Sequence, residues 1–77
     1  MVCGCCGAKK KLLEMFYSVG DGKVRLCRTC WDVVERLESD RAAGEGELYG
    51  IHMLQLRKRA KNPSQAFLAW KEANYPD

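Results

Sequence analysis

Four of the five cysteines form two Cys-x-x-Cys pairs, Cys3 with Cys6 and Cys27 with Cys30, and twenty residues separate the pairs. This spacing is typical of structural zinc sites with four thiolate ligands. Tetrahedral Zn–S bonds of ~2.3 Å bring the sulfur atoms within ~3.8 Å of one another, so two intervening residues let each pair curve around the ion. The sequence therefore predicts one structural Zn2+ bound by these four cysteines.

The fifth cysteine, Cys5, fits this geometry poorly, because its spacing to Cys3 and Cys6 does not direct the sulfur atoms to one point. Gly7 supports the pairing of Cys3 with Cys6. A zinc knuckle turns back sharply after its second cysteine, and glycine adopts the left-handed conformation without penalty. We expect Cys5 to be a partly exposed spectator. The alternative is a substitute ligand or a redox sensor, since a nearby metal and lysines lower the pKa of a thiol.

The length of the chain explains why a metal would matter. The core of a 77-residue domain supplies only ~3–5 kcal/mol, and small domains often add a metal or disulfides. No apolar run approaches the ~20 residues of a membrane-spanning helix, and no signal peptide follows Met1. We therefore expect a cytoplasmic protein without membrane partners. Disulfides are rare in that reducing compartment, and the odd number of cysteines also argues against them.

The segment between the two pairs has the pattern of a β-hairpin. Alternating apolar residues indicate its first strand, and they are Leu13, Met15, Tyr17 and Val19. Asp21-Gly22 is a favoured turn dipeptide, and residues 24–26 form the predicted returning strand. Such a hairpin brings the two cysteine pairs together. Because an isolated hairpin is only marginally stable, we expect the metal and the hairpin to depend on each other.

Helical periodicity begins after the second pair, and Thr29 is the predicted N-cap residue. The apolar residues on or beside one helical stripe are Trp31, Val33, Val34 and Leu37. Knuckle, hairpin and helix follow one another in this order in treble-clef zinc fingers, which the stretch from Cys3 to about Ser39 resembles. The resemblance implies a treble-clef fold around a structural zinc ion. A zinc ribbon, with a strand after Cys30, is the alternative fold.

The rest of the chain is predicted to contain a linker and two helices. Glycines and acidic residues mark the linker, and apolar periodicity indicates helices over 47–61 and 63–74. The expected fold class is a small α+β zinc-binding domain followed by one or two C-terminal helices. The expected domains are a four-cysteine zinc finger over residues 1–40, a linker over 41–46 and a helical extension over 47–77.

The helical extension carries apolar residues on more than one side, which indicates a surface for a protein partner. The residues predicted to form this surface are Leu48, Ile51, Met53, Phe67 and Trp70. Two Cys-x-x-Cys pairs followed by a short helical segment also resemble the Gin family of small anti-sigma factors. That resemblance implies a partner in the transcription machinery. The first hypothesis is therefore a zinc-stabilised regulatory interaction module, either a monomer or a homodimer.

The alternative hypothesis is a nucleic-acid-binding zinc finger. The basic residues available for phosphate contacts are Lys9, Lys10, Lys11, Arg25, Arg28, Arg57, Lys58, Arg59 and Lys61. Four thiolates and Zn2+ change the formal net charge from +3 to about +1, so we expect part of this basic charge to offset the metal site. We expect no enzyme and no catalytic residues, because four cysteines close the coordination shell and His52 is the single histidine.

Overall fold

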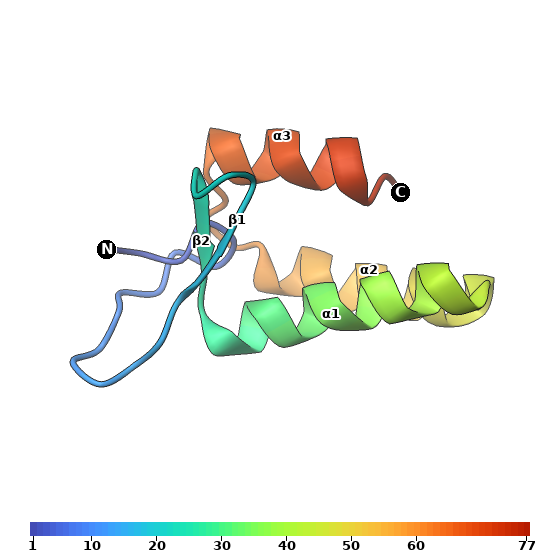
Figure 1. Ribbon diagram of the computed structural model, residues 1–77, viewed down its shortest axis with the longest axis horizontal. Helices are drawn as coiled ribbons and strands as arrows, with labels where there is room; N and C mark the ends of the chain where they lie inside the picture. Colours follow the sequence, from blue (N-terminus) through green and yellow to red (C-terminus); the bar gives the residue numbers. More distant parts are fainter.

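Strands β1 (Tyr17–Val19) and β2 (Val24–Leu26) form an antiparallel hairpin between the two cysteine pairs. They belong to a computed structural model that describes residues 1–77 and contains three helices after the hairpin (Figure 1). The protein therefore has the α+β composition that the sequence predicts, with two helices following the first one.

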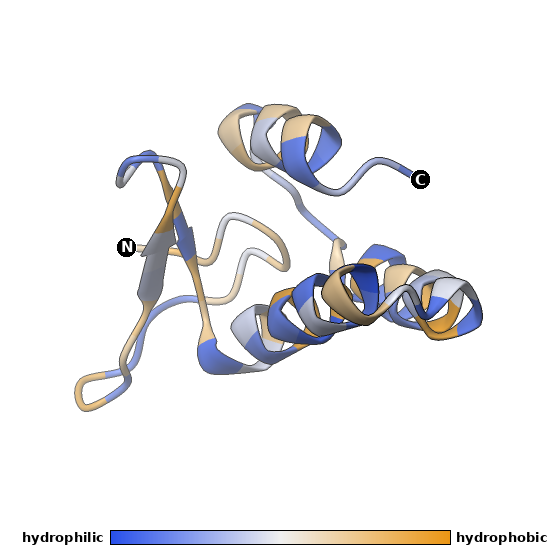
Figure 2. Cartoon of the chain, turned by 45° about the vertical axis from the view of Figure 1, so that its right-hand side comes forward, coloured by the Kyte–Doolittle hydropathy of each residue, from blue (hydrophilic) through white to orange (hydrophobic).

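The hairpin is shorter than predicted, because Leu13 and Met15 lie in a loop before β1, with 94% and 69% of their surface exposed. This 10–16 loop, named for its residues, projects away from the helices in Figure 1, and its tip is apolar in Figure 2. The length of the partner strand explains the difference. Tyr17 pairs with Leu26, and a helix begins two residues later, so no strand remains to pair with the residues before Tyr17.

Helix α1 (Arg28–Ala43) follows β2, α2 (Gly46–Arg59) packs along α1, and α3 (Gln65–Asn74) contacts β2 (Figure 1). The prediction that Thr29 caps α1 is wrong, because Thr29 lies inside the helix. Cys27 occupies the N-cap position with an extended backbone, and its carbonyl already accepts a hydrogen bond from the Trp31 N–H at 2.9 Å. Helical hydrogen bonding thus begins at the end of β2.

Gly44 ends α1 in the left-handed conformation, with a φ of 72°. Only Gly44 and Glu45 separate α1 from α2, so the two helices fold back on each other. Helix α1 extends to Ala43 and so includes part of the segment predicted to be a linker. The division into units over residues 1–40, 41–46 and 47–77 stays a prediction.

One apolar core joins the hairpin, the helices and the cysteines. Its buried members outside the N-terminal cysteines include Val24, Leu26, Val33, Val34, Leu37, Met53, Leu56 and Phe67. A polar pair also crosses the core: the buried Asp40 of α1 contacts His52 Nδ1 of α2 at 2.5 Å. None of the three helices has the length and apolar character that crossing a membrane requires.

The hairpin turn connects the sheet to α3. Gly20, Asp21 and Gly22 all have positive φ values, of 59°, 58° and 80°, in agreement with the predicted turn chemistry. Gly20 lies against Trp70, and a Cβ atom at this glycine would come within 3.0 Å of the indole. A glycine is therefore needed at this position both for its backbone conformation and for the close approach of α3.

Candidate metal centre

The sulfur atoms of Cys3, Cys6, Cys27 and Cys30 all lie within 4.8 Å of one another. Cys6 Sγ and Cys27 Sγ, from different pairs, are 3.9 Å apart, close to the ~3.8 Å between thiolates around a tetrahedral zinc ion. Cys6 is half-buried and the other three are buried. The four cysteines are therefore positioned to bind one metal ion.

The first pair is held in a tight knuckle. The Gly7 N–H donates a hydrogen bond to the Cys3 carbonyl at 2.9 Å, and the Cys3 N–H donates to the Ala8 carbonyl at 2.8 Å. Gly7 has a φ of 79°, the left-handed conformation that its place after Cys6 predicts. The turn directs Cys3 and Cys6 to the same point.

The knuckle also connects two distant parts of the chain through Gly4. The Gly4 N–H donates to the Arg25 carbonyl of β2 at 2.7 Å, and the Gly4 carbonyl accepts from the Ser64 N–H at 2.8 Å. Ser64 is the N-cap residue of α3, and its hydroxyl accepts a hydrogen bond from the Phe67 N–H. The site is thus fixed to the hairpin on one side and to α3 on the other.

The second pair lies where β2 becomes α1. Cys27 is the N-cap residue and Cys30 lies in the first helical turn, so a strand end and a helix start position the two thiols. A helix N-terminus carries a partial positive charge, which favours thiolates near it. This arrangement agrees with the predicted order of strand, cysteine pair and helix.

The four thiols can be ionised together only if a cation offsets their mutual repulsion. Burial opposes the Cys3 thiolate, but hydrogen bonds from the backbone N–H groups of Cys27, Cys6 and Cys5 lower the pKa of Cys3 to about 7. Burial and the neighbouring Cys3 and Cys30 thiols raise the pKa of Cys6 to about 12. Burial and nearby thiols also raise the pKa of Cys27. This donor set fits a soft divalent cation such as Zn2+, which removes the repulsion.

Cys5 is a core residue, and the expectation that it is partly exposed is wrong. It has no exposed surface, and a hydrogen bond to Cys5 together with burial raises the pKa of the Cys30 thiol. The neighbouring Gly4 is hydrogen-bonded to β2 and to the start of α3, and the Cys5 side chain lies against Cys30 inside the protein. Such burial also removes the accessibility that a redox-sensing thiol requires.

Arg59 is the residue of this site that sequence reasoning missed. Its Nε–H donates a hydrogen bond to Cys30 Sγ at 3.2 Å, and this contact raises the pKa of Arg59. The sequence places Arg59 among the residues for phosphate contacts, 29 positions away from Cys30. The only signal for its role is the need for positive charge near four thiolates, which does not select one arginine. Arg59 brings α2 into contact with the metal centre.

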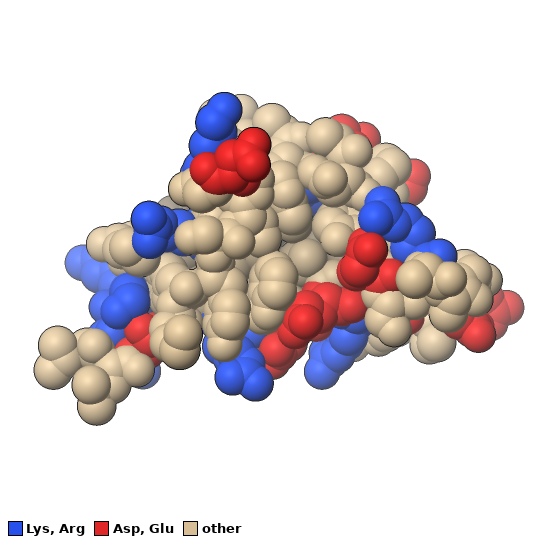
Figure 3. All heavy atoms as spheres, viewed as in Figure 1, with Lys and Arg blue, Asp and Glu red and all other residues tan.

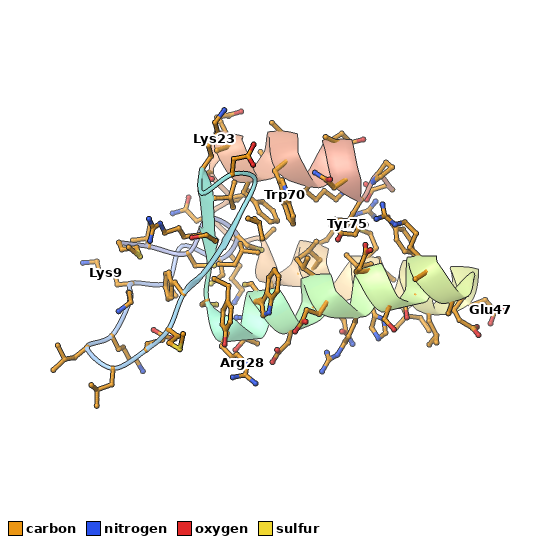
Figure 4. All side chains as sticks on the ribbon, viewed as in Figure 1. Lys9, Lys23, Arg28, Glu47, Trp70 and Tyr75 are labelled. Carbon is orange, nitrogen blue, oxygen red and sulfur yellow. The ribbon has the colours of Figure 1, made fainter.

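Of the other eight predicted basic residues, two are neutralised by carboxylates and six are not. Arg28 pairs with Asp32, and Arg57 pairs with Asp77. Lys9, Lys10, Lys11, Arg25, Lys58 and Lys61 are exposed and form no ion pair. Figure 3 shows basic side chains around the hairpin and the 10–16 loop, and Figure 4 shows Lys9 and Arg28 pointing away from the core.

The predicted partner surface is divided by the fold. Met53 and Phe67 are 4% and 1% exposed, so they belong to the core and cannot form a docking surface in this structure. Leu48 and Ile51 are 42% and 52% exposed on α2, and Trp70 is half-buried on α3. The structure therefore does not bring the five residues together on one exposed face.

Comparison with known proteins found no matching protein-family model, no matching curated protein and no matching solved structure. Four protein thiolates complete a tetrahedral shell, as in structural rather than catalytic metal sites.

Cys6→Ser should abolish stable metal binding and unfold the N-terminal region, because structural zinc supplies on the order of 10 kcal/mol of apparent folding free energy in small domains. Cys5→Ala is the matched control, and it should keep about one equivalent of metal while losing roughly 1–2 kcal/mol of stability. Elemental analysis and thermal unfolding of the reduced proteins measure both effects. Similar metal loss in the two variants would contradict the ligand assignment.

Arg59→Met should weaken metal binding by about 10- to 100-fold, because it removes a hydrogen bond and a positive charge from the Cys30 thiolate. Lys58→Met is the control, since Lys58 is exposed and has no ion-pair partner. Competition with a coloured chelator gives the affinity of each variant. If both variants bind the metal equally well, the Arg59 contact has no role in the site.

Metal binding should release protons and should strengthen as the pH rises. The pKa of Cys3 is about 7, that of Cys6 is about 12, and those of Cys27 and Cys30 are raised. Each ion should therefore displace about four protons near pH 6 and about three near pH 8. A pH indicator in weakly buffered protein measures this release when Zn2+ is added. Release of a single proton at both pH values would rule out four thiolate ligands.

Proposed function

We propose that this protein is a zinc-stabilised interaction module that presents helix α2 to a protein partner. The observation that carries this proposal is the two-sided apolar character of α2. Met53 and Leu56 pack into the core, whereas Leu48, Ile51 and Leu54 remain 42%, 52% and 55% exposed on the outside. Exposed apolar residues at such helical spacing are typical of a helix that docks into a groove of another protein. We name these three exposed residues the α2 stripe.

The metal centre supports this role because it is structural. A closed shell of four thiolates leaves no coordination position for substrate or water, so its contribution is to stabilise the fold. Arg59 extends this stabilisation to the end of α2 through Cys30. Zinc binding in a reducing cytoplasm would thus fix the helix that carries the α2 stripe.

The partner that we favour is a component of the transcription machinery. The order of knuckle, hairpin and helix around the four cysteines resembles treble-clef zinc fingers, and the cysteine spacing resembles the Gin family of anti-sigma factors. Both resemblances agree with a small regulatory protein that acts by binding rather than by catalysis. A sigma factor is therefore the first partner to test.

Nucleic-acid binding is the second candidate, and the lysines at positions 9, 10 and 11 support it, because they are adjacent, exposed and free of ion pairs. The second basic cluster, which consists of Arg57, Lys58, Arg59 and Lys61, supports it less. Arg57 is bound to Asp77 and Arg59 is directed at Cys30, so two of its four cations are already used within the protein.

The α2 stripe should be required for partner capture. Metal-loaded protein on a resin should retain a sigma factor from a nuclease-treated lysate under reducing conditions, and Ile51→Ser with Leu54→Ser should reduce its retention at least about tenfold. Leu68→Ser is a suitable control, since Leu68 is 42% exposed on α3, as Leu48 is on α2.

Each outcome of this experiment has a defined meaning. If a protein other than a sigma factor is retained, and the α2 variants lose it, the result would support the interaction module and contradict the anti-sigma role. Capture from an untreated lysate that disappears when the lysate is treated with nuclease would favour the nucleic-acid hypothesis. If no protein is retained, or if the α2 variants and Leu68→Ser behave alike, the proposed function is wrong.

A further inference from the structure

An aromatic groove lies between the hairpin, α1 and α3. Its volume is about 250 Å3, and its lining residues are Val19, Trp31, Val34, Glu35, Glu38, Trp70 and Tyr75. Figure 3 shows a largely uncharged surface in this region with acidic side chains along the α1 edge, and Figure 4 shows Trp70 and Tyr75 between α3 and α1. The volume is below the usual range for small-molecule pockets, ~300–1,000 Å3, so the groove suits a smaller group than a drug-sized ligand.

The aromatic walls of the groove are held in place by other rings. Trp31 stacks on Tyr17 with a centroid distance of 5.4 Å and an interplanar angle of 5°. The rings of Trp70 and Tyr75 meet edge-to-face with a centroid distance of 5.6 Å, and Gly20 of the hairpin turn lies against Trp70. Rings that are fixed in this way present preformed faces to a ligand, which limits the entropy cost of binding.

The acidic edge of the groove has one free carboxylate. Glu38 is engaged, since it accepts hydrogen bonds from Arg41 at 2.7 Å and from the Tyr75 hydroxyl at 3.0 Å. Glu35 is exposed and forms no ion pair or hydrogen bond, and it lies four residues after Trp31 on the same face of α1. The groove therefore combines two indole rings with an unneutralised negative charge.

Two lining residues of the groove, Tyr75 and Glu38, already bind a cation of the chain. The Arg41 guanidinium lies 5.0 Å from the centre of the Tyr75 ring and is paired with Glu38. The rest of the groove has the indole rings and Glu35, and no lysine or arginine is among its lining residues. Arg28 lies nearby beside Tyr17, but it is paired with Asp32. A guanidinium in this part of the groove would gain the same two interactions, a contact with aromatic faces and a pair with a carboxylate.

We propose that this groove binds one arginine side chain from a basic segment of the partner protein, between Trp31 and Trp70 and close to Glu35. The inference rests on the proposed function, because it supplies a second contact for the same partner. Arginine fits better than lysine, since its planar guanidinium can stack on an indole while it pairs with a carboxylate.

The groove can be tested without the partner, because the two tryptophans of the chain both line it. Tryptophan fluorescence of the metal-loaded protein therefore reports on the groove, although Trp70 also lines a second hollow beside Asp21, and the Glu35→Gln variant distinguishes the two places. The probe is acetyl-Gly-Arg-Gly-amide at constant ionic strength, and the matched control peptide carries citrulline, an uncharged analogue of nearly the same shape. We expect a saturable change with the arginine peptide at millimolar concentrations, and binding at least about fivefold weaker with citrulline.

Two protein variants test whether Glu35 is the carboxylate that pairs with the arginine of the peptide. Glu35→Gln should weaken binding of the arginine peptide at least about fivefold. Glu47→Gln, an exposed acidic residue of α2 that forms no ion pair, should leave binding unchanged. Equal responses to the arginine and citrulline peptides, an unchanged affinity in Glu35→Gln, or no saturable change up to ~50 mM peptide would each overturn the inference. The proposed function would survive any of these results if partner capture still depended on the α2 stripe.

Discussion

The convergence of four buried thiols on one point is the constraint on which the rest of this structure depends. Two of the thiols come from a knuckle at the start of the chain, and two come from the junction of β2 and α1. Burial and neighbouring thiols raise the pKa values of Cys6, Cys27 and Cys30, so these thiols stay protonated until a cation binds. A bound cation would let all four ionise together, and Arg59 contributes positive charge at the edge of the site. A single electrostatic centre therefore connects the knuckle, the hairpin, α1 and the end of α2.

The remaining helix is joined to this centre through the backbone. Gly4 forms hydrogen bonds to both β2 and Ser64, and Ser64 starts α3. The C-terminal residues add polar contacts, from the Tyr75 hydroxyl to Glu38 and from Lys71 to Asp77. This arrangement positions α3 so that Trp70 faces α1 and leaves the outer side of α2 uncovered. The two surfaces that we propose for partner binding thus depend on the same metal-centred framework.

The features that the sequence predicts well are local. The ligand pairs, the glycines of the knuckle and turn, and the three helical segments each depend on a few neighbouring residues, and the structure contains them. The exposure of Leu13 and Met15 depends instead on where the partner strand ends. The burial of Cys5 and the use of Arg59 depend on which segments pack around the site. Those packing relations join residues that are far apart in the sequence, and no local pattern encodes them.

The 10–16 loop gives the metal centre a further property. It lies between the two ligand pairs along the chain, yet Leu12 and Leu13 at its tip are 92% and 94% exposed and outside the core. A metal ion bound by both cysteine pairs would hold the two sides of the loop together, as a crosslink would. With the ion bound, we expect this loop to be the place where the chain accepts a nick, an inserted sequence or new termini while its two parts stay assembled.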